Sequence, residues 1–139
     1  MKVLIDTCVI VDYLENREGA DAAERIFNDK ALDRWISAKS IMDLFYLIHH
    51  FTHSNERTKE AIRRIIGIMS GIVDTTAEDV RKALASLTSD YEDAVMIETA
   101  VRMQADAIIT DNVKDYKHSE VKVYTPNDFL KICGQKGEL

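Results

Sequence analysis

The chain has 139 residues, of which 46% are hydrophobic and 30% are charged, and its formal net charge at pH 7 is -6. This length fits one domain, residues 1–139, and the plentiful aliphatic residues and mixed charges exclude a disordered chain. No apolar run approaches the ~20 residues that a membrane span needs, and the acidic balance, read alone, argues against a basic nucleic-acid-binding domain.

The first half of the chain alternates short apolar runs with helical patterns. The spacing of Ala23, Ile26 and Phe27 predicts one apolar helix face. The segment from Ser40 to about His50 is apolar nearly all round, so we expect a buried helix there. The predicted elements are a strand at Lys2–Ile5, helices at Cys8–Leu14 and Ala20–Phe27, a strand at Trp35–Ser37, and helices at Ser40–His50 and Arg57–Met69.

The second half continues this alternation with clearer helix starts. Thr75 and Glu78 have the spacing of a capping box, which opens a helix that runs to about Leu87. Thr125 followed by Pro126 predicts the start of the last helix. The other predicted elements are strands at Ile72–Val73, Ala107–Thr110 and Val121–Tyr124, and a helix at Asp90–Gln104. Strands that alternate with helices predict an α/β fold, a three-layer α/β/α sandwich around a short, mostly parallel central sheet.

The cysteines and the first residues favour a cytoplasmic protein. Cys8 and Cys133 lie at opposite ends of the chain, and two lone cysteines are more typical of buried thiols in a reducing compartment than of a disulfide, although a disulfide stays open. The N-terminus has one Lys2 and then Asp6 within its apolar run, so we do not expect a signal peptide.

Acidic residues mark the places where such a fold binds ligands, beyond the carboxyl ends of its strands. Asp6 and Asp111 directly follow predicted buried strands, and Asp43 and Asp93 lie in apolar stretches of predicted helices. Buried carboxylates that meet at one edge repel one another unless a cation neutralises them. Oxygen ligands without convincing His or Cys partners are typical of Mg²⁺ or Mn²⁺, which support phosphodiester hydrolysis.

Each acid also has a purely structural interpretation, which the sequence leaves open. Asp6 suits the cap of the first helix, and Asp111 suits a turn after a strand. Asp43 could face solvent on an amphipathic helix. Asp90 fits a helix cap better than a ligand, and Glu92 fits a solvated position.

The chain resembles the PIN domain, a family of metal-dependent ribonucleases that includes the VapC toxins of toxin–antitoxin pairs. The resemblance covers essentially the whole length. It is carried by Val3-Leu4-Ile5-Asp6-Thr7-Cys8, Ile36-Ser37-Ala38-Lys39-Ser40-Ile41-Met42-Asp43-Leu44, Asp90-Tyr91-Glu92-Asp93-Ala94 and Ala107-Ile108-Ile109-Thr110-Asp111-Asn112-Val113-Lys114-Asp115-Tyr116. The run from Asp43 to Tyr46 is similar to a subgroup with Asp in place of Glu at the second acidic position.

The resemblance implies roles for these residues. Asp6 and Asp93 match the family's first and third acids, and the shorter Asp43 is expected to reach a metal through water. One of Asp111, Asn112 and Asp115 completes the site, and which one stays open. The implied catalytic residues are Asp6, Asp43, Asp93 and Asp111, and the implied metal ligands are Asp6, Asp93, Asp111, Asn112 and Asp115. Lys114, Lys117, Thr7 and Thr110 are the candidate substrate-binding residues, although the two threonines also suit a helix cap and a strand end.

The implied function is a Mg²⁺- or Mn²⁺-dependent endoribonuclease that hydrolyses phosphodiester bonds of single-stranded RNA. As a toxin it would pair with an antitoxin protein, and it would form a homodimer through its early helices. The alternative is a catalytically weak protein of the same fold that binds RNA or a partner. Metal-dependent cleavage separates the two hypotheses.

Overall fold

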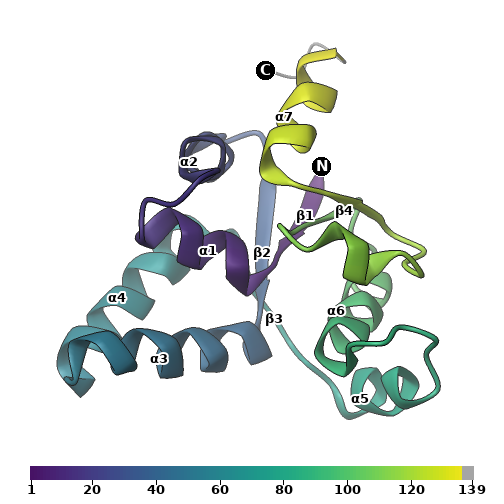
Figure 1. Ribbon diagram of the computed structural model, residues 1–139, viewed down its shortest axis with the longest axis horizontal. Helices are drawn as coiled ribbons and strands as arrows, with labels where there is room; N and C mark the ends of the chain where they lie inside the picture. The colour runs from purple at the N-terminus through teal and green to yellow at the C-terminus, as the bar shows by residue number, and fades with distance from the viewer. Residues whose placement is uncertain (136–139) are drawn as a thin grey trace.

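Figure 1 shows the computed structural model, which describes residues 1–135 of the chain. The last four residues of the predicted domain, 136–139, lie outside the described residues. The elements in chain order are β1 (Lys2–Ile5), α1 (Thr7–Leu14), α2 (Ala20–Asn28), β2 (Asp33–Ser37), α3 (Ala38–Thr52), α4 (Asn55–Ile68), β3 (Gly71–Val73), α5 (Ala77–Leu84), α6 (Tyr91–Arg102), β4 (Ala107–Ile109), the 3-10 helix η1 (Val113–Tyr116), β5 (Lys122–Tyr124) and α7 (Pro126–Gln135).

The strands form one sheet with the order β3-β2-β1-β4-β5, and every pairing in it is parallel. The register pairs Leu4 of β1 with Ile108 of β4, so the two central strands end side by side. Apart from Lys2, their residues are completely buried because helices cover both faces of the sheet, which explains why these strands are apolar runs. The predicted α/β class and parallel sheet are confirmed.

The helices divide into two layers, as Figure 1 shows. Val3 and Ile5 face a large core that includes buried residues of α1, α2, α3, α4 and α7. Leu4 and Ile108 face the opposite way, into a smaller core with α6 and Tyr116 of η1. Helix α5 packs against α6 on that second side. No helix in the described part of the chain is long and apolar enough to cross a membrane.

The capping box of α5 begins one residue later than the sequence predicts. Thr76, not Thr75, caps the helix, and it exchanges hydrogen bonds with Asp79 rather than with Glu78. The reason is tertiary, because the Asp79 side chain is buried and accepts hydrogen bonds from Thr99 and Arg102 of α6. The helix also ends at Leu84, before the predicted Leu87.

The ion pair between Asp79 and Arg102 fastens α5 to α6, the helix that carries Asp93. Arg102 Nη2 lies 3.0 Å from Asp79 Oδ2, and Arg102 Nε lies 3.0 Å from Asp79 Oδ1. Burial alone would raise the pKa of Asp79, but the hydrogen bonds from Arg102, Thr76 and Thr99 outweigh it and hold this pKa below its usual value. Asp79 is therefore ionised in the folded protein.

Helix α3 is not buried all round, contrary to the sequence prediction. Leu44 is completely buried, but Met42, Tyr46 and Phe51 are 73%, 77% and 69% exposed. Helices α1, α4 and strand β2 contact α3 on its other sides, so they cover only part of its apolar surface. The helix thus leaves large apolar side chains on the protein surface.

Candidate active site

Asp6 lies at the carboxyl end of β1, where the chain turns into α1. Its Oδ1 accepts a hydrogen bond from the backbone N–H of Thr7, so Asp6 is the N-cap of α1. Its Oδ2 accepts from Thr110 Oγ1 at 2.8 Å and lies 3.6 Å from Cys8 Sγ. The capping interpretation and the site interpretation are therefore compatible, because one oxygen caps the helix while the other meets residues from β4 and α1.

Asp93 is brought close to Asp6 by the buried side chain of Tyr116. The Tyr116 hydroxyl lies 3.0 Å from Asp6 Oδ2 and 3.1 Å from Asp93 Oδ1. Asp93 occupies the first turn of α6, whose N-cap is Asp90, as the sequence suggested for that residue. The Tyr116 hydroxyl has one proton to donate, so it cannot form full hydrogen bonds to both carboxylates. The two oxygens therefore lie close together with negative charge that this hydroxyl does not neutralise.

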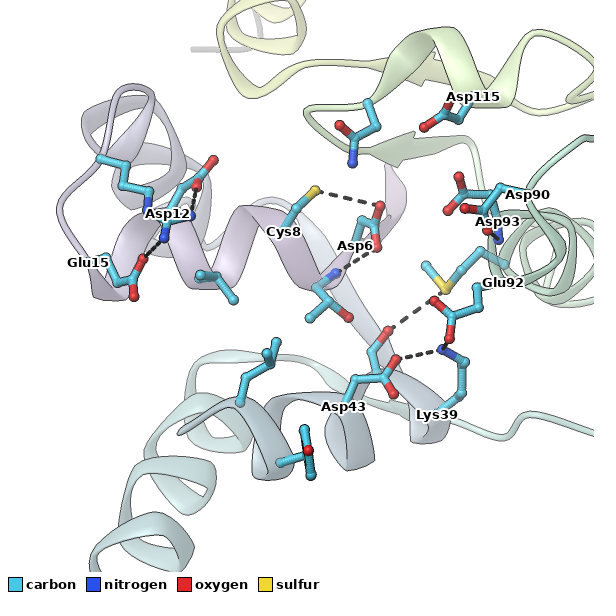
Figure 2. A pocket seen from close by; sticks show the side chains of 18 of the residues that line it. Asp6, Cys8, Asp12, Glu15, Lys39, Asp43, Asp90, Glu92, Asp93 and Asp115 are labelled. Atoms are coloured by element: carbon cyan, nitrogen blue, oxygen red, sulfur yellow. Dashed lines mark hydrogen bonds and ion pairs between the residues drawn. The ribbon is translucent and has the colours of Figure 1, made fainter. Parts of the chain in front are cut away.

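A cavity of about 650 Å³ opens beside these two carboxylates, between α1, α3, α6 and η1. Eight acidic side chains line it, and Figure 2 shows how they gather around it. They are Asp6, Asp12, Glu15, Asp43, Asp90, Glu92, Asp93 and Asp115. Apolar side chains of α1 and α3 form part of its wall, among them Val11, Leu47 and Phe51.

Two basic residues line the same cavity, and acids hold both of them. Arg17 pairs with Glu15 and lies 3.6 Å from Asp12. Lys39 Nζ lies 2.6 Å from Asp43 Oδ2 and 3.2 Å from Glu92 Oε1 (Figure 2). Burial lowers the pKa of Lys39, but the hydrogen bonds from these two carboxylates outweigh it and raise this pKa above its usual value. The ammonium group of Lys39 is therefore charged at neutral pH.

The remaining acids carry charge that no cation compensates. Within residues 1–135, no Lys, Arg or His side chain forms an ion pair with Asp6, Asp93 or Asp115. Burial raises the pKa of Asp93 to about 6, with further contributions from Asp90, Asp6 and Asp115 that exceed the opposing effect of the Tyr116 hydrogen bond. Such crowding is the physical signature of a place where a cation would be stabilised.

Cys8 lines the cavity beside Asp6, and Asp111, which does not line it, contacts Cys8. Burial and the neighbouring Asp12 carboxyl raise the pKa of Asp111 to about 7. The Asp111 backbone N–H donates to Cys8 Sγ at 3.4 Å. Burial, followed by the charge of Asp6, raises the pKa of the Cys8 thiol to about 12, so this free cysteine is a neutral thiol.

The donor set fits a hard divalent cation in part. Asp6 and Asp93 present converging carboxylate oxygens, which Mg²⁺ and Mn²⁺ prefer. In the described residues, no three His, Cys, Asp or Glu side chains converge on one point. An ion held here would thus take two carboxylates from the protein and complete its shell with water, as Mg²⁺ commonly does.

The structure brings some of the predicted site residues into the cavity and leaves others outside. Asp6, Thr7, Asp43, Asp93, Asn112 and Asp115 line it. Asp111, Lys114 and Lys117 are exposed near it but do not line it, and Thr110 is completely buried. The Thr110 hydroxyl donates to Asp6, so it supports that carboxylate from behind and does not face the cavity. These positions leave their functional roles as predictions.

Sequence reasoning missed two residues that shape this cavity. Lys39 precedes Asp43 by four residues, which is the spacing of neighbours on a helix surface, so this pair was visible in the sequence. Tyr116 gave no comparable signal, because only the tertiary structure brings its hydroxyl from η1 to β1 and α6. Glu92 is 71% exposed, as expected for a solvated residue, and it also lines the cavity and pairs with Lys39.

Comparisons with known proteins agree with this architecture. The sequence model of one family, the PIN domain, matches residues 2–114. No curated protein matches the chain in sequence. Among solved structures, VapBC-1 from nontypeable Haemophilus influenzae has a TM-score of 0.72 and 18% identity, over 91% of this chain and 99% of that one. A toxin–antitoxin complex from Klebsiella pneumoniae has a TM-score of 0.67 and 21% identity, over 89% and 97% of the chains. The Sarcin-Ricin loop cleaving toxin VapC20 from Mycobacterium tuberculosis has a TM-score of 0.60 and 13% identity, over 76% and 86%.

Proposed function

Because this chain belongs to the PIN-domain family, we propose that it is a metal-dependent endoribonuclease that hydrolyses phosphodiester bonds of single-stranded RNA. The observation that carries the proposal is the convergence of Asp6 Oδ2 and Asp93 Oδ1 on one hydroxyl at the carboxyl end of the central strands. This is the edge of a parallel sheet where ligands bind. Two findings support this choice of reaction: nucleases are general in this family, and one toxin of similar fold is described as cleaving the Sarcin-Ricin loop.

Asp6 and Asp93 would hold one Mg²⁺ or Mn²⁺ ion in the proposed enzyme, with Asn112 and Asp115 at the rim of the same cavity. A divalent ion bound there supplies charge stabilisation at the phosphate and a nucleophile at neutral pH. The chain's own residues do the positioning. Thr110 and the Thr7 backbone fix both oxygens of Asp6, and Tyr116 fixes the distance between the two carboxylates.

RNA would reach the cavity past two exposed lysines at η1. Lys114 lies on this short helix and Lys117 directly follows it, and neither forms an ion pair within the described residues. Their free charge suits contacts with phosphate groups, which a cavity lined by eight carboxylates would otherwise repel. Thr7 lines the cavity beside Asp6 and is available to a bound substrate.

We also propose a protein partner, an antitoxin, for the surface beside the cavity. Structural neighbours are toxin–antitoxin complexes, and here Tyr46 and Phe51 are large exposed apolar residues that line the cavity. A small partner that covered them would also block the acids. A homodimer through the early helices belongs to the same proposal, and light scattering of the purified chain at several concentrations tests it. We expect the protein to act in the cytoplasm, where such an RNA substrate is found.

The experiment that tests the proposed reaction is cleavage of a labelled single-stranded RNA by the purified chain in Mg²⁺, in Mn²⁺ and in EDTA. The proposal predicts internal cleavage with either metal and none in EDTA. The alternative function, a catalytically weak binding protein, is favoured by the pairing of Asp43 with Lys39. RNA binding in a gel-shift assay without cleavage in any metal would support that alternative.

A further inference from the structure

Lys39 occupies a central position in the acidic cavity. Its ammonium group lies between Asp43 of its own helix and Glu92 of α6, at 2.6 Å and 3.2 Å (Figure 2). The side chain is only 27% exposed, although lysine normally extends into solvent. Lys39 thus connects α3 to α6, the helix that carries Asp93, across one side of the cavity.

The position of Lys39 within its helix disfavours a positive charge. Ser37 caps α3, so Lys39 is the second residue of the helix, where the exposed N–H groups and the helix dipole repel cations. The order of Lys39 followed by Asp43 is also the weaker order for a helical ion pair. The position within the helix therefore does not explain a lysine here. The two neighbouring carboxylates, of Asp43 and Glu92, explain it because they stabilise its positive charge.

Four of the eight cavity acids form two groups that differ in their counterion. Asp43 and Glu92 share the ammonium group of Lys39. Asp6 and Asp93 have no basic partner among residues 1–135, and only hydrogen bonds connect them. Nucleases that use two metal ions need carboxylates open to both ions, because two cations stabilise the attacking and the leaving oxygen. Only the second group is open here.

We propose that Lys39 takes the place of a second divalent ion. The cavity then binds one metal ion, between Asp6 and Asp93, and the ammonium of Lys39 is the second positive charge that faces the substrate phosphate. This inference rests on the proposed nuclease function, and it assigns Asp43 and Glu92 the role of holding Lys39 rather than the role of metal ligands.

The test is the number of Mn²⁺ ions that the protein binds, measured by calorimetry and by electron paramagnetic resonance on EDTA-treated, dialysed protein. The wild type should bind one ion. Lys39→Met, which keeps the aliphatic stem, should bind a second ion or bind the first about tenfold more tightly, since a nearby positive charge is removed. Lys82→Met is the control, because Lys82 also pairs with an acid four residues away, Glu78, but on an exposed helix surface. It should bind one ion with unchanged affinity.

A second variant keeps the test decisive if Lys39→Met does not fold. Asp43→Asn should leave the affinity for the single ion within about twofold, whereas loss of a true ligand costs about tenfold or more. Three outcomes would each overturn the role of Lys39 and leave the nuclease proposal standing. They are two ions bound by the wild type, unchanged Mn²⁺ binding in Lys39→Met, and lost binding in Asp43→Asn. A wild type that binds no Mn²⁺ would instead refute the nuclease proposal, and the role of Lys39 with it.

Discussion

The metal-free protein should be more stable in mild acid than at neutral pH, because its site contains carboxyl groups that favour protonation in the folded state. Burial and neighbouring acids raise the pKa of Asp93 to about 6, and burial with the Asp12 carboxyl raises that of Asp111 to about 7. In the unfolded chain both groups have a pKa of about 3.9. The folded state therefore binds more protons between these values, and its stability falls as pH rises from about 4 to about 7.

The magnitude follows from these shifts after allowance for solvent. A shift of one pKa unit corresponds to about 1.4 kcal/mol, so the Asp93 shift has an upper limit of about 3 kcal/mol. Both carboxyl groups are partly exposed, and solvent screens much of this effect, so we expect about 1 kcal/mol from each. With a urea m-value of about 2 kcal/mol per M, the unfolding midpoint should be about 1 M lower at neutral pH than in mild acid.

Urea unfolding of EDTA-treated protein, followed by far-UV circular dichroism at about pH 4 and about pH 7.5, measures this difference directly. Asp93→Asn should lose about half of it, because this variant lacks one of the two groups. Asp128→Asn removes an exposed carboxylate of α7 as a matched control and should keep the whole difference. Equal midpoints at the two pH values, or an unchanged difference in Asp93→Asn, would refute the reasoning.

Three further variants test the packing that supports the site. Arg102→Met should lower the free energy of unfolding by about 3 kcal/mol at pH 7, because it leaves the buried Asp79 carboxylate without its ion pair. This loss should become smaller below about pH 4, because the lowered pKa of Asp79 stabilises the fold only while the carboxylate is ionised. Gly71→Ala should cost about 1–3 kcal/mol, since a Cβ there would lie 2.7 Å from Trp35 Cζ3. Tyr116→Phe keeps the buried ring but removes the hydroxyl shared by two carboxylates, and should cost about 2 kcal/mol. Urea unfolding measures all three, and a change below about 0.5 kcal/mol in any of them would contradict the contact concerned.

The sequence predicted the parts of this protein that depend on local patterns. All five predicted strands form the parallel sheet, and Thr125 caps the last helix through the Asp128 N–H, as its position before Pro126 suggested. The sequence singled out Asp6 because it follows a buried strand, where α/β folds bind ligands, and Asp93 because it lies in an apolar stretch of a predicted helix. Their catalytic roles stay predictions.

The parts that the sequence could not supply depend on contacts between distant segments. The cap of α5 shifted to Thr76 because Arg102, more than twenty residues away, binds the Asp79 carboxylate. The exposed face of α3 could not be predicted from composition, because an apolar helix with one uncovered side has the same sequence pattern as a buried one. The subgroup assignment based on Asp43 stays a prediction.

The measurement that tests the central claim most directly is single-turnover cleavage of labelled single-stranded RNA in Mn²⁺ by the wild type, Asp6→Asn, Asp93→Asn and the control Asp128→Asn. We expect metal-dependent cleavage by the wild type and the control, and a loss of about a thousandfold in both site variants, because each removes a carboxylate that the ion needs. Circular dichroism and urea midpoints should show that both site variants fold. Folded Asp6→Asn or Asp93→Asn protein that cleaves at the wild-type rate would contradict the assignment of these two carboxylates as the catalytic centre.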